Sequence, residues 1–304
     1  MAYHSPPTSN SACDVTLLSR GGLMATMSKV HASAKKDEKA YMPDYSFLIR
    51  HQQSNTYMLF DLGMSHTETT YTPTTLKKYS SFVPEFSKEP MDVAVKKLIP
   101  TGAKIKYVAY SHAHFDHCYP ISQFFESDAD VITRDTIAIF GPGTQQRISP
   151  GWPHNESSEF HAEHFSGNIK TLELPPIGGD EWMSPLATFD YAYDFFKDGS
   201  LYFVHAPGHV IGHMMAAVRL NDGLMVILGG DCCHSKQILL GKEQIAIYED
   251  GTSLHEDLDT AKETIRRSRE WVEQSNGTVG IILAHDGEWK ETLPSKIAKL
   301  IEAA

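Results

Sequence analysis

The sequence predicts an α/β sandwich in which strands and helices are mixed in each half of the chain. Short stretches rich in β-branched and aromatic residues recur, bounded by polar or glycine-containing turns, as in strands. Between them lie stretches with apolar residues at every third or fourth position, the spacing of amphipathic helices. The 304 residues are 41% hydrophobic and contain no long Pro, Gly or Ser linker, so we expect one compact domain.

The first half of the chain is expected to be mostly β-structure. "MDVAVKKLI" (91–99) has helical spacing and stops at Pro100, and "ISQFFES" (121–127) is expected to be a short helix. Strands are expected at residues 14–20, 45–51, 56–63, 104–110 and 128–134.

The second half repeats hairpins and then turns helical. "KDGS" and "NDG" are turn signals between apolar stretches, and they predict two hairpins. Leu258, Ala261 and Ile265 follow helical spacing in a helix expected over 257–274, which ends before Asn276-Gly277. The expected strands are 186–196, 200–209, 214–220, 224–231 and 278–286, and 294–304 is expected to be a closing helix.

Two segments do not fit these patterns. Residues 1–12 are polar and contain proline, and we expect a flexible tail before a single domain over 13–304. Residues 141–176 are rich in Gly, Pro and aromatic residues. Irregular segments of this length are usually lids, binding loops or disordered chain. The aromatic residues favour a packed, lid-like insertion.

Charge and cysteine content narrow the classes of function. The 38 acidic and 27 basic residues give a net charge of −11, which repels polyanions, so no nucleic-acid partner is expected. The apolar runs are shorter than a membrane span, and the first residues lack a signal-peptide pattern, so we expect a cytoplasmic protein. The four cysteines, Cys13, Cys118, Cys232 and Cys233, are expected to be reduced.

Histidines and aspartates follow four of the expected strands. They lie in "SHAHFDHC" (111–118), "VHAPGH" (204–209), "LGGD" (228–231) and "LAHD" (283–286). Strand ends that open into loops present binding residues at one edge of a sheet. In an extended backbone His112, His114 and Asp116 would point one way and His117 the other. Imidazole and carboxylate ligands suit Zn²⁺ first, with Mn²⁺, Fe or Co²⁺ as alternatives.

The four motifs occur in the order found in the metallo-β-lactamase superfamily, and the chain resembles that family over most of residues 14–290. The resemblance implies a four-layer αβ/βα sandwich with two zinc ions per chain. It implies that His112, His114 and His209 bind the first metal, and that Asp116, His117 and His285 bind the second. Asp231 would bridge the two ions, and Asp61 in "FDLG" would lie near them.

Within the superfamily, the complete ligand set resembles N-acyl homoserine lactonases and glyoxalase II thioesterases more than true β-lactamases. Phe115 and "APGHVIGH" favour the lactonase branch. Those lactonases carry a tyrosine three residues after the bridging aspartate, where this chain has His234. The interval between His112 and His209 is also longer, and the excess falls in 141–176. An aromatic lid suggests a small aromatic lactone or lactam, such as the benzoxazolinones that fungal and soil relatives open.

The resemblance implies a hydrolytic mechanism. Two neighbouring metals lower the pKa of a water, and the resulting hydroxide attacks the carbonyl of a cyclic ester or amide. Asp116 would transfer the proton and His234 would donate a hydrogen bond to the oxyanion. The expected role is degradation of a xenobiotic or signal molecule, that is, detoxification. The residues expected to contact the substrate are Phe115, Trp152, Phe160, His161, His164 and Phe165.

Other functions remain open at this level. A glyoxalase II-like thioesterase would usually carry a basic C-terminal region, but "PSKIAKLIEAA" has only two lysines. The net negative charge argues against a nuclease, because it repels nucleic acid. A non-catalytic metal-binding module would be expected to lack one of the ligand residues. A redox di-iron relative would need a glutamate in place of His114. A small-molecule substrate is the only partner expected, and an oligomer is possible.

Overall fold

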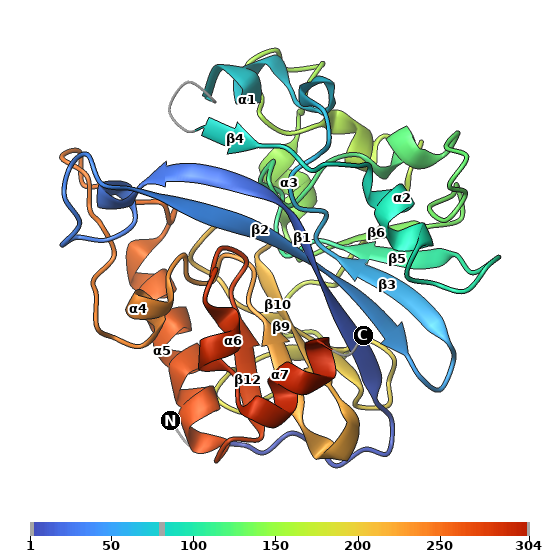
Figure 1. Cartoon of the computed structure of the whole chain (residues 1–304), viewed down its shortest axis with the longest axis vertical. Coiled ribbons are helices and arrows are strands. Elements are labelled where there is room, and N and C mark those ends of the chain that lie inside the picture. Colours follow the sequence, from blue (N-terminus) through green and yellow to red (C-terminus); the bar gives the residue numbers. More distant parts are fainter. Residues whose placement is uncertain (1–2, 79–82, 303–304) are drawn as a thin grey trace.

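A computed structural model describes residues 3–78 and 83–302 and contains two β-sheets packed face to face between outer helices (Figure 1). The α/β sandwich is thus confirmed. The seven-stranded sheet has the order β4-β1-β2-β3-β5-β6-β7 and the five-stranded sheet the order β12-β11-β10-β9-β8. The strands are β1 (Cys13–Thr26), β2 (Lys39–His51), β3 (Thr56–Phe60), β4 (Val83–Glu85), β5 (Ile105–Ala109), β6 (Ile137–Phe140), β7 (Lys170–Glu173), β8 (Ala192–Asp194), β9 (Leu201–His205), β10 (Met214–Arg219), β11 (Met225–Leu228) and β12 (Val279–Ile282).

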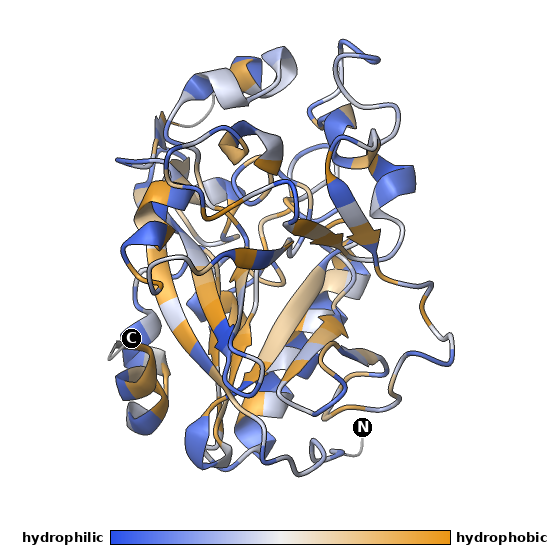
Figure 2. Cartoon of the chain, turned by 90° about the vertical axis from the view of Figure 1, so that its right-hand side faces the viewer, coloured by the Kyte–Doolittle hydropathy of each residue, from blue (hydrophilic) through white to orange (hydrophobic). Residues whose placement is uncertain are grey.

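The core fills the space between the sheets and continues under the outer helices. Met214 and Ala216 of β10 pack between the sheets, whereas Met215 and Ala217 face the helical layer. Strands buried on both faces read as continuous apolar runs, which is why the pattern of β10 shows no alternation. Figure 2 shows these hydrophobic strands in the middle of the molecule.

Helices cover the outer face of each sheet. Trp271 of α5 is fully buried against the five-stranded sheet, and Val95 of α2 packs on the seven-stranded one. The Asp257 carboxylate caps α5 by accepting from the Thr260 N–H at 3.0 Å. The helices are α1 (Pro73–Lys78), α2 (Met91–Lys96), α3 (Thr144–Ile148), α4 (Lys236–Leu239), α5 (Leu258–Gln274), α6 (Trp289–Thr292) and α7 (Ser295–Glu302). The last two residues of the expected closing helix lie outside the described residues.

Strands β1 and β2 extend well beyond their predicted ends. Residues 22–26 and 39–43, here called the distal arm, pair as far as η1 (Met27–Lys29), at the left of Figure 1. The register of β1 against β2 shifts between Ser19 and Gly22. Gly21 has a φ of +82°, and a Cβ there would lie 2.1 Å from the Glu85 carbonyl oxygen, so only glycine allows β4 to approach.

Three predicted elements are wrong or shorter than expected. Residues 128–134 form turns, since Asp130 has a φ of 51° and the strand starts only at Ile137. Residues 121–124 form a 3₁₀ rather than an α-helix. In 186–196 only β8 is a regular strand, because Ala187 has a φ of 51° and a bridge between Leu186 and Phe189 closes a tight turn.

Both atypical segments contact the body of the domain. His4 exchanges two backbone hydrogen bonds with Ala187, of 2.9 and 2.7 Å, and the Pro7 carbonyl accepts from Arg219 at 2.6 Å. The flexibility of residues 1–12 stays a prediction, and Met1 and Ala2 lie outside the described residues. The 141–176 segment contains α3, η5 (Ala162–Phe165) and β7, an edge strand of the large sheet. Among the described residues, no helix combines the length and apolarity needed to cross a membrane.

Candidate metal centre

The structure brings the seven predicted ligand residues together where strands of both sheets end. Four of them follow β5, and one each follows β9, β11 and β12. All except His114 are almost completely buried. The seven are His112, His114, Asp116, His117, His209, Asp231 and His285.

The backbone of the first motif turns, contrary to the expectation of an extended segment. The His117 and Cys118 N–H groups both donate to the His114 carbonyl, at 3.1 and 2.8 Å. This turn carries Asp116 and His117 away from His112 and His114. One short motif therefore supplies residues to two adjacent clusters.

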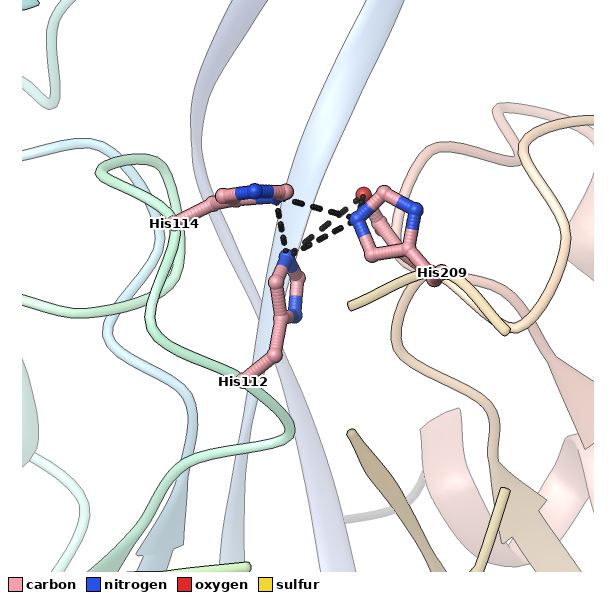
Figure 3. A group of neighbouring side chains, drawn as sticks. His112, His114 and His209 are labelled. Carbon is pink, nitrogen blue, oxygen red and sulfur yellow. Dashed lines mark hydrogen bonds and ion pairs between the residues drawn. The ribbon is translucent and has the colours of Figure 1, made fainter. Parts of the chain in front are cut away.

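The first cluster consists of three imidazoles (Figure 3). The His112 Nε2 and His114 Nδ1 atoms are 2.9 Å apart, and His209 Nε2 lies 3.2 and 3.0 Å from them. Nitrogen ligands bonded tetrahedrally to zinc at about 2.0–2.1 Å would be about 3.3 Å apart. The three nitrogen atoms therefore converge at nearly the separations that one zinc ion requires.

The second cluster lies on the other side of Asp231. Asp231 Oδ1 is 3.3 Å from His117 Nε2 and 3.1 Å from His285 Nε2. Its Oδ2 atom lies 3.4 Å from His209 Nε2. Asp116 Oδ2 is 3.8 Å from His285 Nε2. One carboxylate thus faces both clusters, which is the geometry of a bridging ligand.

The electrostatics of the two clusters differ. Burial lowers the pKa of His112 and of His209 well below the usual value, so both rings are neutral and offer a lone pair. Burial also opposes charge on His117, but the neighbouring carboxylates of Asp231 and Asp116 outweigh it and raise the pKa of His117 well above the usual value. The pKa of His285 is likewise raised, by Asp231 and Asp44 against burial.

These shifts fit a cation site. Burial raises the pKa of Asp231, but His285 and His117 outweigh it and hold that pKa well below the usual value. His117 Nε2 and Asp231 Oδ1 are buried without a hydrogen-bond partner among the described residues. A metal ion can take the place of the protons that carboxylates otherwise hold on neighbouring imidazoles. The donor set fits two divalent ions of the zinc type.

Carboxylates outside the clusters orient the imidazoles. Asp61 accepts from the Ser111 N–H at 2.6 Å and from the Ser111 hydroxyl at 2.8 Å, and lies 3.0 Å from His117 Nδ1. His285 Nδ1 donates to the Pro43 carbonyl at 2.9 Å, and Asp44 Oδ1 lies 2.9 Å from the same nitrogen as an ionic contact. Burial raises the pKa of Asp44 to about 6. Such contacts fix the ring that presents its other nitrogen to a metal. Asp61 was predicted near the site, whereas Asp44 was missed, because no local pattern indicates its contact with His285.

His213 fixes the backbone of Asp231. Its Nδ1 atom donates to the Ala206 carbonyl at 2.8 Å, and its Nε2 atom accepts from the Asp231 N–H at 3.1 Å. The two bonds specify one neutral tautomer. Burial lowers the pKa of His213 to about 4, so this tautomer persists at neutral pH.

Two further histidines lie beside the first cluster. His234 Nε2 is 3.1 Å from Asp231 Oδ2. The ring centroid of His255 is 4.7 Å from that of His234 and 5.2 Å from that of His209. His255 is buried, and burial lowers its pKa to about 2. Sequence reasoning missed His255 because it lies in a loop with no preceding strand.

A cavity of about 250 Å³ opens above the clusters. Phe115, a predicted substrate contact, lines it, and the Phe160 ring lies parallel to His114 at 6.5 Å. His161 lines a separate cavity of about 10 Å³ together with Phe160 and His164. The residues that line the main cavity are Leu23, Ala25, Thr26, Lys29, Val30, Met42, Lys78, His114, Phe115, Asp116, Glu159, His209, Asp231, His234, Leu254 and His285.

Five of the six predicted substrate contacts, all except Phe115, are absent from the lining of the main cavity. His164 is buried, and its Nε2 atom lies 3.4 Å from the Cys118 sulfur. Phe165 packs against Phe140, and Trp152 pairs with His161 inside the 141–176 segment. His164 and Phe165 pack against Phe140 of β6, whereas Trp152 packs within the segment, so these positions give no support to a substrate contact.

No protein-family model matches the chain, but solved structures share its fold. A structure of B. thuringiensis AiiA with N-decanoyl-L-homoserine at its active site superposes with a TM-score of 0.63 at 16% identity, covering 94% of this chain and 96% of that one. The two proteins therefore share one fold, an αββα sandwich, and in this chain the paired clusters lie where strands of its two sheets end.

Curated relatives extend the comparison. A metallo-hydrolase of Annulohypoxylon moriforme is 33% identical over 66% of this chain and 50% of its own length. A γ-lactamase of Fusarium pseudograminearum is 31% identical over 75% of this chain and 55% of its own length. The chain thus spans about half the length of these relatives. Its sequence is similar to those of a metallo-hydrolase and a γ-lactamase, and its fold is the metallo-β-lactamase fold.

Proposed function

We propose that the chain is a metal-dependent hydrolase that opens a small cyclic ester or amide, a lactone or γ-lactam, with two zinc ions. The observation that carries the proposal is the position of Asp231, whose two oxygen atoms face two clusters of imidazoles. The γ-lactamase name of the Fusarium relative supports a cyclic amide as one substrate class. A small aromatic lactam of the benzoxazolinone type is the favoured example, and detoxification in the cytoplasm is the proposed role.

The proposed ligand roles follow from the two clusters. His112, His114 and His209 would hold one ion, Asp116, His117 and His285 the other, and Asp231 would bridge them. When bound, such a pair of ions polarises a carbonyl and lowers the pKa of a water molecule towards neutrality.

The chain supplies the proton transfer and the hydrogen bonds. Asp116 lines the cavity, so its carboxylate can accept the proton of the attacking water and return it to the leaving alkoxide or amide nitrogen. His234 lines the same cavity beside His209, and its ring can donate an N–H to the oxyanion. The apolar walls exclude water from the carbonyl.

Metal analysis combined with turnover tests this proposal. We expect two zinc ions per chain by mass spectrometry of the native protein, and turnover on a panel of lactones, γ-lactams, β-lactams and thioesters. A chelator should abolish turnover, and added zinc should restore it. Turnover that persists after complete metal removal would contradict the proposal, and turnover of thioesters alone would favour the glyoxalase II-like alternative.

A further inference from the structure

Two lysines line the main cavity. Lys78 forms an ion pair with Glu159, so its charge is already compensated. Lys29, the last residue of η1, is exposed and also lines the cavity. Within residues 3–78 and 83–302, no hydrogen bond or ion pair is formed by the Lys29 ammonium group. Lys29 is thus an uncompensated positive charge at the entrance.

The backbone of Lys29 is held in place. The Tyr248 hydroxyl donates to the Lys29 carbonyl at 3.2 Å, and the Ala246 N–H donates to the Val30 carbonyl at 3.0 Å. The Val30 N–H closes η1 on the Met27 carbonyl at 2.9 Å. These bonds tie the tip of the distal arm to the 245–248 segment. The backbone of Lys29 is therefore fixed, and only its side chain would become ordered when an anion binds.

The wall between Lys29 and the metal clusters is apolar. Leu23 and Met42 are paired across the distal arm, and both line the cavity together with Val30. A cavity of about 250 Å³ lies below the roughly 300–1,000 Å³ typical of sites for drug-sized ligands. The space therefore suits one compact apolar ring system, with its polar groups at the two ends.

The net charge of the chain makes a local cation necessary for binding an anion. At a net charge of −11 the protein repels anions at long range, so an anionic ligand needs a local cation to bind. In the rim of this cavity that cation is Lys29, because Lys78 is neutralised by Glu159. The methylene chain of Lys29 also extends the apolar wall, while its ammonium group stays in water.

We propose that Lys29 forms an anion subsite, and that the preferred substrate is an apolar lactone or lactam ring system carrying an acid group at the end remote from the scissile carbonyl. This inference rests on the proposed function, since it assumes that the scissile carbonyl faces the two clusters. The acid group makes a charge-assisted hydrogen bond with Lys29, which selects acidic over neutral substrates of equal size.

Matched substrates test the subsite in the metal-loaded enzyme. We would compare a benzo-fused γ-lactone with its carboxylated analogue, with the carboxylate on the benzene ring. We expect kcat/KM to favour the acid about 10-fold at low salt, through KM, and the preference to shrink as salt is added. Lys29→Met should remove the preference for the acid, whereas Lys29→Arg should keep it. Lys36→Met, an exposed lysine of the same hairpin outside the cavity, is the control.

Binding of uncleavable analogues separates this inference from the proposed function. The cyclic ethers that correspond to the two lactones would be titrated calorimetrically into the metal-loaded protein. If the carboxylated ether binds no tighter than the neutral one, or binds equally well to Lys29→Met, the subsite is refuted. If it binds tighter through Lys29 but no lactone or lactam is cut, the subsite stands and the proposed hydrolysis fails.

Discussion

The floor and the wall of the cavity are built in different ways. The floor consists of buried imidazoles and carboxylates, each following a strand directly and each placed within 4 Å of another polar group. The wall consists largely of apolar side chains from the distal arm, whose alternate residues face outward. Replacement of a polar group in the floor should destabilise the protein strongly, because a buried polar group left without a partner raises the free energy of the folded state. The wall tolerates exchange of one apolar residue for another.

Removal of Asp231 should be the most damaging change. Asp231→Ala takes away the carboxylate that faces both clusters, and we expect loss of at least one metal ion and more than about 100-fold lower kcat. Metal content and turnover would be measured on the same preparation. Asp286→Asn, which alters a buried carboxylate outside the clusters, is the control. An unchanged metal count in Asp231→Ala would exclude a bridging role.

Replacement of His234 should separate turnover from metal binding. His234→Phe keeps a ring beside His209 and His255 but removes the N–H, so we expect about 100-fold lower kcat with two metals retained. Steady-state kinetics and metal analysis would test this. Full activity in this variant would remove His234 from the mechanism.

Loss of the Asp61 charge should weaken metal binding without abolishing it. Asp61→Asn keeps the shape of the side chain but removes the negative charge next to His117 Nδ1. We expect about 10–100-fold lower affinity for the second metal, measured by competition with a chelator. Equal affinity in the variant and the native protein would show that Asp61 has only a structural role.

A change in the wall should have the smallest effect and should depend on which face is altered. Leu23→Ala enlarges the cavity, and we expect about 10-fold lower kcat/KM for an apolar lactone, through KM, with metal content unchanged. Met24→Ala changes the next residue, which is 37% exposed on the opposite face of β1, and should alter kcat/KM less than twofold. Equal effects of the two substitutions would contradict the assignment of the wall.

The sequence predicted the floor well and the wall poorly, for a physical reason. Each floor residue stands within a few positions of an apolar strand, so local pattern alone places it at a strand end. The distal arm depends on long-range pairing. The predicted strands 14–20 and 45–51 stop short of Gly22 and Pro43, although these two residues lie opposite each other at the shift in register. Tertiary contacts with β4 there override local propensity.

His255 and Asp44 could not be found by the same reasoning. His255 reaches the first cluster through a loop whose course depends on backbone hydrogen bonds to the strand end at Gly208 and His209. Asp44 contacts His285 across two segments that are 241 positions apart in the chain. Neither contact leaves a signal in the residues around it.

The contact between Gly208 and α5 links metal binding to the stability of a whole helix. A Cβ at Gly208 would lie 2.3 Å from the Ala261 nitrogen, and the Glu256 and Asp257 N–H groups donate to the His209 and Gly208 carbonyls. The turn that carries His209 and the first turn of α5 therefore form one cooperative unit. By thermodynamic linkage, an ion bound by His209 would oppose local unfolding of α5, and loosening of α5 would lower the affinity for that ion.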